Sequence, residues 1–126
     1  MTTTPLKPLP SDAHLERNLL GAVLVNPALL VQVRDALGVD DFMYADNRRV
    51  YAAMLAAVDA QRMIDELVLR EIDPAITFAC LLELTQGVPR LDRVGEWVRS
   101  LKGYAIQRRA IEAAAKYGEL LYQPGF

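Results

Sequence analysis

Residues 40–58 read DDFMYADNRRVYAAMLAAV and carry the strongest helix signal in the chain. Asp46 is the predicted N-cap, because its carboxylate can accept hydrogen bonds from the free N–H groups of the first helical turn. Three apolar residues then recur at helical spacing on one face: Val50, Met54 and Val58. The opposite face carries alanines, which let neighbouring helices approach closely. We therefore predict a central helix that ends near Gln61 and is buried on more than one side.

Two helices are predicted before this segment. Ser11 or Asp12 is the expected N-cap of the first, which carries a row of apolar residues on one side: Leu15, Leu19, Leu20, Val23 and Leu24. Asn26-Pro27 combines an N-cap residue with proline at the first helical position and predicts the start of the second helix. This helix would bury Leu30, Val33 and Leu37 and end at Gly38, which is the predicted left-handed cap.

Two more helices are predicted after the central one. The connector between them would place Met63 and Ile64 in the core. Asp65 is positioned to cap a short helix over residues 66–72. Asp73-Pro74 repeats the cap-plus-proline signal and predicts a helix that ends near Thr85.

The C-terminal segment is also helical by pattern, and the pattern allows two shapes. Apolar residues recur at helical spacing from Leu91 through Val94 and Val98 to Leu101. Lys102-Gly103 could form the turn of a helical hairpin. Alternatively, the apolar pattern keeps its phase across Gly103, which would fit one long helix kinked there.

The expected fold is therefore all-α, with a compact bundle of about five helices followed by a long C-terminal helix or helical arm. The length of 126 residues and the 52% apolar content fit a single soluble domain with its own core. We expect a flexible tail over residues 1–10, a globular head over 11–88, and an arm over 89–126 that packs on the head.

Charge is distributed unevenly. Residues 1–89 hold seven basic and twelve acidic side chains, whereas residues 90–126 hold seven basic and four acidic ones. This asymmetry favours contacts between copies of the chain or with charged protein partners. The overall net charge of −2 argues against strong direct nucleic-acid binding.

Residues suited to catalysis or metal binding are scarce. Cys80 is the single cysteine and lies in an apolar segment, so we interpret it as a core thiol rather than a nucleophile. His14 is the single histidine and is expected at the surface. One such histidine is unlike the arrangement that a metal site or a serine triad requires. No phosphate-binding G-x-x-x-x-G-K-[ST] sequence occurs. We expect no enzyme activity and no cofactor.

No apolar run approaches membrane-spanning length and no signal-peptide core is present, so we expect a cytoplasmic protein.

Four segments, taken together, resemble a known family. The first reads ERNLLGAVL over residues 16–24, and the second is Asp41-Phe42 followed by the helix that begins near Arg49. The third is Ile64-Asp65, and the fourth is Trp97-Val98 followed by Leu101 and Arg108-Arg109. In this order and spacing, over roughly residues 10–122, the chain resembles the N-terminal domain of DnaB-type replicative DNA helicases.

The resemblance implies a protein-interaction module. In that family the domain pairs helicase subunits in the hexamer collar and offers a surface to the primase. The family's domain ends in a helical hairpin, and residues 91–122 would be its first arm, which favours one long helix here. The residues expected to contact partners lie on that arm: Leu91, Val94, Val98, Arg99, Leu101, Lys102, Arg108, Arg109 and Ile111.

The expected partners are helicase subunits, a second copy of this chain, or primase. An alternative function is a stand-alone mimic of the helicase domain that regulates helicase or primase by competition. A third hypothesis, a nucleic-acid module built on the basic arm, is weak because acidic residues are interleaved with the basic ones.

Overall fold

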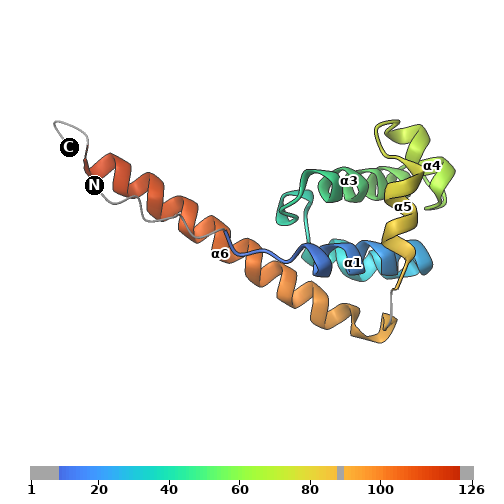
Figure 1. Cartoon of the computed structure of the whole chain (residues 1–126), viewed down its shortest axis with the longest axis horizontal. Helices are drawn as coiled ribbons and strands as arrows, with labels where there is room; N and C mark the ends of the chain where they lie inside the picture. The colour runs from blue at the N-terminus through green and yellow to red at the C-terminus, as the bar shows by residue number, and fades with distance from the viewer. Residues whose placement is uncertain (1–8, 88–89, 123–126) are drawn as a thin grey trace.

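The computed structural model describes residues 9–87 and 90–122, and all regular structure within these ranges is helical (Figure 1). Most of the predicted flexible tail, residues 1–8, lies outside this description. The six α-helices are α1 Ala13–Val25, α2 Leu30–Ala36, α3 Ala45–Asp59, α4 Glu66–Ile72, α5 Phe78–Thr85 and α6 Val94–Leu121. Short 3-10 turns precede α2, α3 and α6 at Pro27–Leu29, Val39–Asp41 and Leu91–Arg93. These elements confirm the predicted all-α class.

Helices α1 to α5 form a small head, and α6 passes along one side of it and continues far beyond (Figure 1). The helix runs without a break through Gly103, so the hairpin turn considered at that residue is wrong. The stripe of α6 residues that faces the head keeps its phase across Gly103 and reaches Arg108. Packing against the head therefore holds the glycine in helical conformation despite its low helix propensity.

No single helix in the described part of the chain is long and apolar enough to cross a membrane; α1 and the Pro27–Ala36 segment meet that test only jointly, as a pair bent by 118°.

The apolar face of α3 lies at the centre of the core, as predicted. Val50, Tyr51 and Met54 are at most 1% exposed. The Tyr51 hydroxyl donates a hydrogen bond to the Leu37 carbonyl at 2.7 Å, and its ring packs on Phe42 with centroids 4.7 Å apart. Burial raises the pKa of Tyr51 to about 12, so this hydroxyl stays a donor at any physiological pH.

The other face of α3 does not follow the prediction. Ala52, Ala56 and Ala60 are exposed, whereas Ala53 and Ala57 lie in the core. The expectation that α3 is buried on several sides is therefore wrong. The head packs against one broad face of the helix and leaves the alanine face to solvent.

The start of α3 is stabilised by a residue from another helix. Asp46 is not the N-cap, because the helix begins one residue earlier and the Asp46 side chain is exposed. Instead, the Glu16 carboxylate of α1 accepts hydrogen bonds from the backbone N–H of Met43 at 2.7 Å and from the side-chain amide of Asn47 at 2.9 Å. Glu16 is only 2% exposed. This buried carboxylate joins α1 to the beginning of α3 and to the turn before it.

Two of the predicted caps are confirmed. Asp12 accepts a hydrogen bond from the Leu15 N–H at 3.0 Å, and Asp65 accepts one from the Val68 N–H at 2.9 Å. The left-handed cap predicted at Gly38 is wrong. Gly38 has an extended conformation with φ of −94°, because its N–H is held by the Asp41 carboxylate at the start of the next turn.

The segment between α3 and α5 contains two further corrections. Met63 is 77% exposed, so only Ile64 of the expected pair enters the core. Asp73-Pro74 does not start a helix, because the Asp73 side chain accepts a hydrogen bond from the Ala75 N–H at 3.0 Å and forms a turn. Helix α5 begins four residues later, where Thr77 caps it by accepting from the Cys80 N–H at 3.1 Å.

The Asp65 cap provides a simple stability test. Replacing Asp65 with alanine should lower the free energy of unfolding by about 1 kcal/mol, because the first turn of α4 loses its side-chain acceptor. Urea unfolding followed by circular dichroism would measure this change. Asp40→Ala is the control, because Asp40 is exposed and should change stability by less than about 0.5 kcal/mol. Equal effects of the two substitutions would contradict the capping role.

Candidate protein-interaction surface

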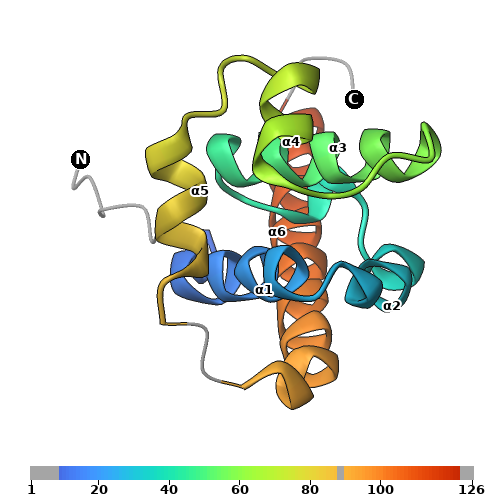
Figure 2. The same ribbon diagram turned by 90° about the vertical axis from the view of Figure 1, so that its right-hand side faces the viewer.

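The two halves of α6 have different environments. The first half packs against α1, α2 and the Val39–Asp41 turn. Its residues Val94, Val98, Leu101 and Ala105 are all at most 7% exposed. In Figure 2, α6 crosses behind α1, and Figure 1 shows that it then continues past the head. The second half of the helix carries no buried residue after Arg108.

This geometry divides the residues predicted to contact partners. Val94, Val98 and Leu101 lie in the core of the chain itself, and Leu91 packs partly buried against it. These positions are covered by the head and are not open to a partner in this structure. Arg99 and Ile111 are exposed, the latter at 46%.

The other predicted contact residues surround Asp41. The Asp41 carboxylate is 2% exposed and accepts hydrogen bonds from the Gly38 N–H at 2.7 Å and from Lys102 Nζ at 3.2 Å. Arg109 forms a second ion pair with the same carboxylate. Burial alone would raise the pKa of Asp41, but the Gly38, Arg109 and Lys102 hydrogen bonds outweigh it and hold that pKa below its usual value. Asp41 therefore stays ionised at neutral pH and anchors the arm to the head.

Arg108 makes a separate connection beside this ion-pair cluster. It is 6% exposed and donates to the Asp41 carbonyl at 2.6 Å and to the Pro10 carbonyl at 2.9 Å. Both of its partners are backbone carbonyls, and neither is a carboxylate. It therefore joins the N-terminal segment, the Val39–Asp41 turn and α6 at one point.

The far half of α6 is the largest exposed apolar feature of the arm. Its exposed apolar residues are Ile111, Tyr117, Leu120 and Leu121, with exposed Ile106 shortly before them and exposed Tyr122 at the C-cap. Ile106, Tyr117 and Leu120 share one side of the helix, because their separations are close to whole turns. These three side chains are 55%, 62% and 42% exposed, respectively. Long apolar side chains on a projecting helix are typical of a protein-interaction surface.

Cys80 is half-buried, and burial raises the pKa of its thiol. The thiol is therefore protonated at neutral pH, which fits the interpretation of a core thiol better than that of a nucleophile.

Sequence reasoning misses the roles of Asp41 and Glu16. The sequence pattern around Asp40-Asp41 is that of an ordinary pair of carboxylates at the start of a helix. Glu16 is noted only as part of the first segment that resembles the family. Apart from the Gly38 hydrogen bond of Asp41, each carboxylate makes its contacts with residues more than 25 positions away, such as Asn47 and Lys102. The one available signal is the polar residue Glu16 within an otherwise apolar helix face.

Together, the fold and the exposed arm define a helical head-and-arm domain whose last helix continues beyond the head. The chain belongs to the DnaB-like helicase N-terminal domain family, whose sequence profile matches residues 8–103. This confirms the resemblance drawn from the four sequence segments.

Individual relatives agree with this assignment. The chain is 28% identical to the replicative DNA helicase DnaB of Geobacillus stearothermophilus over 87% of its length, and 26% identical to that of Pasteurella multocida over 94%. It spans 26% and 28% of the lengths of these relatives.

Two solved structures share the fold. The N-terminal domain of DnaB helicase from Mycobacterium tuberculosis superposes with a TM-score of 0.83 at 21% identity, covering 91% of this chain and 87% of that one. The N-terminal domain of DnaB helicase from Helicobacter pylori, described together with its interactions with primase, gives 0.79 at 22% identity, covering 86% and 90%.

Proposed function

We propose that this chain is a non-catalytic protein-interaction domain of the DNA replication machinery, acting in the cytoplasm. It would pair with a helicase subunit or a second copy of itself, and it would bind primase. The observation that carries this proposal is the projecting half of α6 with its uncovered apolar side chains. Membership in the family and the primase interactions described for the Helicobacter pylori domain support it.

The pairing surface would be the side of α6 that carries Ile106, Tyr117 and Leu120. Pairing two such helices would bury these side chains, which is the main favourable contribution to helix association in water. Ala113 lies on the same side between them and allows two helix backbones to approach. The sequence-based candidates Val94, Val98 and Leu101 take no part, because the head already covers them.

The test is light scattering on a sizing column, first with this protein alone and then with the C-terminal domain of its cognate primase. We expect a dimer of the 14.0 kDa chain, or a stoichiometric complex with the primase domain. Tyr117→Asp should weaken self-association about tenfold or more, because it places a charge on the apolar side. Gln107→Asp is the matched control on the same helix. It should leave the molar mass measured by light scattering unchanged, because Gln107 is exposed and polar.

A protein that stays monomeric and ignores the primase domain would overturn the proposal. The competitor hypothesis would then be tested by adding the protein to a working helicase–primase pair and measuring primer synthesis.

A further inference from the structure

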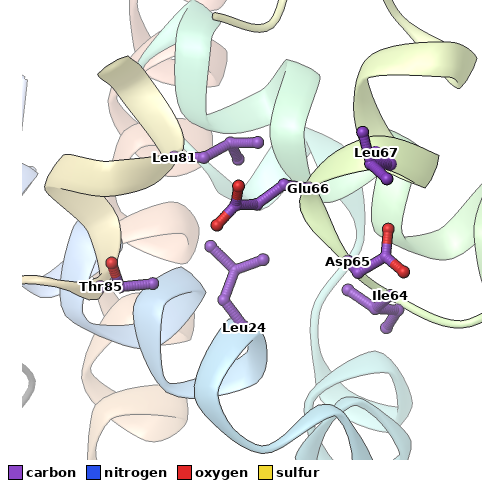
Figure 3. Close-up of a pocket in the computed structure, with 7 residues that line it drawn as sticks. All are labelled: Leu24, Ile64, Asp65, Glu66, Leu67, Leu81 and Thr85. Atoms are coloured by element: carbon purple, nitrogen blue, oxygen red, sulfur yellow. The ribbon is translucent and has the colours of Figure 1, made fainter. Parts of the chain in front are cut away.

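A pocket of about 380 Å³ lies in the head, away from α6. It is formed where the end of α1, the residues before α4, the start of α4 and one side of α5 meet (Figure 3). Its volume is at the lower end of the range of about 300–1,000 Å³ found for ligand pockets. None of the residues that line it belongs to α6, so it is distinct from the proposed pairing surface.

The floor of this pocket is apolar, whereas part of its rim is acidic. The floor consists of the buried side chains of Ile64 and Leu81 and the half-buried side chain of Leu24. The rim includes the exposed residues Asp65, Glu66 and Leu67, and Leu67 is 73% exposed. The exposed Leu67 side chain beside the apolar floor extends the apolar surface at the rim of the pocket.

Glu66 gives the pocket its chemical character. In Figure 3 its carboxylate projects between Leu24 and Leu81, over the apolar floor. No lysine, arginine or histidine lines the pocket, and within the described residues Glu66 makes no ion pair. Asp65 uses one carboxylate oxygen to cap α4 and adds a second negative charge to the rim. The pocket therefore presents two carboxylates next to apolar surface, with no basic group of its own.

A lysine or arginine beside an apolar residue complements this arrangement. The apolar residue can occupy the floor, and the methylene stem of the basic residue can lie along Leu24 or Leu81 while its cation reaches Glu66. Amphipathic helices commonly bind grooves through such apolar anchors, and the charges at the rim then select the partner.

We propose that this pocket docks an amphipathic peptide segment of a partner protein, anchored by a leucine-like side chain and a neighbouring lysine or arginine. The proposal is independent of pairing through α6, because the two surfaces share no residue.

The test uses the full chain and two synthetic peptides of about 12 residues, a length suited to one groove-bound helix. Both peptides carry leucines at helical spacing. One has lysines at its polar positions and the other has glutamates there. We expect the lysine peptide to shift the methyl NMR signals of Leu24, Ile64 and Leu81, whereas Val31, which is exposed on α2, should not respond. The glutamate peptide should cause no shift.

Three variants make the result specific. Glu66→Lys should weaken binding of the lysine peptide about tenfold or more, because it replaces attraction by repulsion at the rim. Thr85→Phe should also weaken it, because the larger side chain would fill part of the pocket that Thr85 lines. Asp35→Lys reverses an exposed carboxylate on α2 and should leave binding unchanged. Circular dichroism would confirm that each variant is folded.

Three outcomes would overturn the proposal. The first is equal binding of the two peptides, and the second is equal binding to the Glu66→Lys and Asp35→Lys variants. The third is a change of oligomeric state in Glu66→Lys, which would identify a second copy of the chain as the occupant. Loss of pairing in Tyr117→Asp with peptide binding retained would separate this site from the proposed function of α6.

Discussion

Truncating Leu101 to alanine is expected to lower the free energy of unfolding by about 2–5 kcal/mol, the range for leucines in well-packed cores. Leu101 is 2% exposed and lies where α6 crosses the head. Its removal would leave a cavity between α6 and the head, because the helix is held in place by contacts on both sides of this position. An effect of this size would be a large fraction of the stability of a chain of this length.

The matched control is Ile111→Ala, ten residues further along the same helix. Ile111 is 46% exposed and lies beyond the last buried residue of α6, so the change in stability should be within about 0.5 kcal/mol. Urea unfolding followed by circular dichroism would measure both variants. Similar losses at the two positions, or a loss at Ile111 alone, would contradict the division of α6 into a docked half and a projecting half.

The Leu101 and Ile111 variants also separate two interpretations of the arm. The sequence places both residues in one group of apolar residues that could contact a partner. The structure assigns them different surroundings, because the head covers only the first half of α6. If Leu101 served a partner instead, its truncation would change association and leave the stability of the chain nearly unchanged.

Much of the fold could be predicted because it depends on local patterns. Asp12 and Asp65 cap helices within their own segments, and the apolar face of α3 is visible at helical spacing. Such features need only a few consecutive residues.

The two cap-plus-proline signals are less reliable. Asn26-Pro27 begins a 3-10 turn that leads into α2, whereas Asp73-Pro74 forms a turn that ends before α5. The same type of dipeptide therefore starts a helix in one place and delays it in another.

The candidate site could be predicted less well, because it depends on contacts between distant segments. Nothing local to Asp40-Asp41 indicates which of the two carboxylates faces α6 and receives Lys102 and Arg109, which lie more than sixty residues away in the sequence. For the same reason, the apolar stripe of α6 could be assigned to a helix but not divided into covered and uncovered parts. That division depends on the length of the head, which no residue of α6 encodes.

The ion-pair cluster at Asp41 should make the stability of the protein depend on pH in acid. The pKa of Asp41 is lowered in the folded state from its ordinary value of 3.8. In the acid range the unfolded chain therefore binds more protons than the folded one, so stability rises with pH. The contribution of Asp41 is fully present above its ordinary pKa and is lost as the pH falls through the lower pKa of the folded state.

Replacing Asp41 with asparagine removes this charge while keeping the size of the side chain. At neutral pH we expect the substitution to lower the free energy of unfolding by about 1–3 kcal/mol, because hydrogen bonds from charged donors to a carboxylate become bonds to a neutral amide. The difference from the unmodified protein should shrink as the pH is lowered below the ordinary pKa of aspartate, because the native carboxyl then becomes neutral as well. Urea unfolding at a series of pH values would record this convergence, with Asp40→Asn as the control at the neighbouring exposed position. If the difference in the free energy of unfolding stays constant down to the lowest pH of the series, Asp41 acts through its shape and not through its charge. The ion pairs with Lys102 and Arg109 would then contribute nothing to holding the arm.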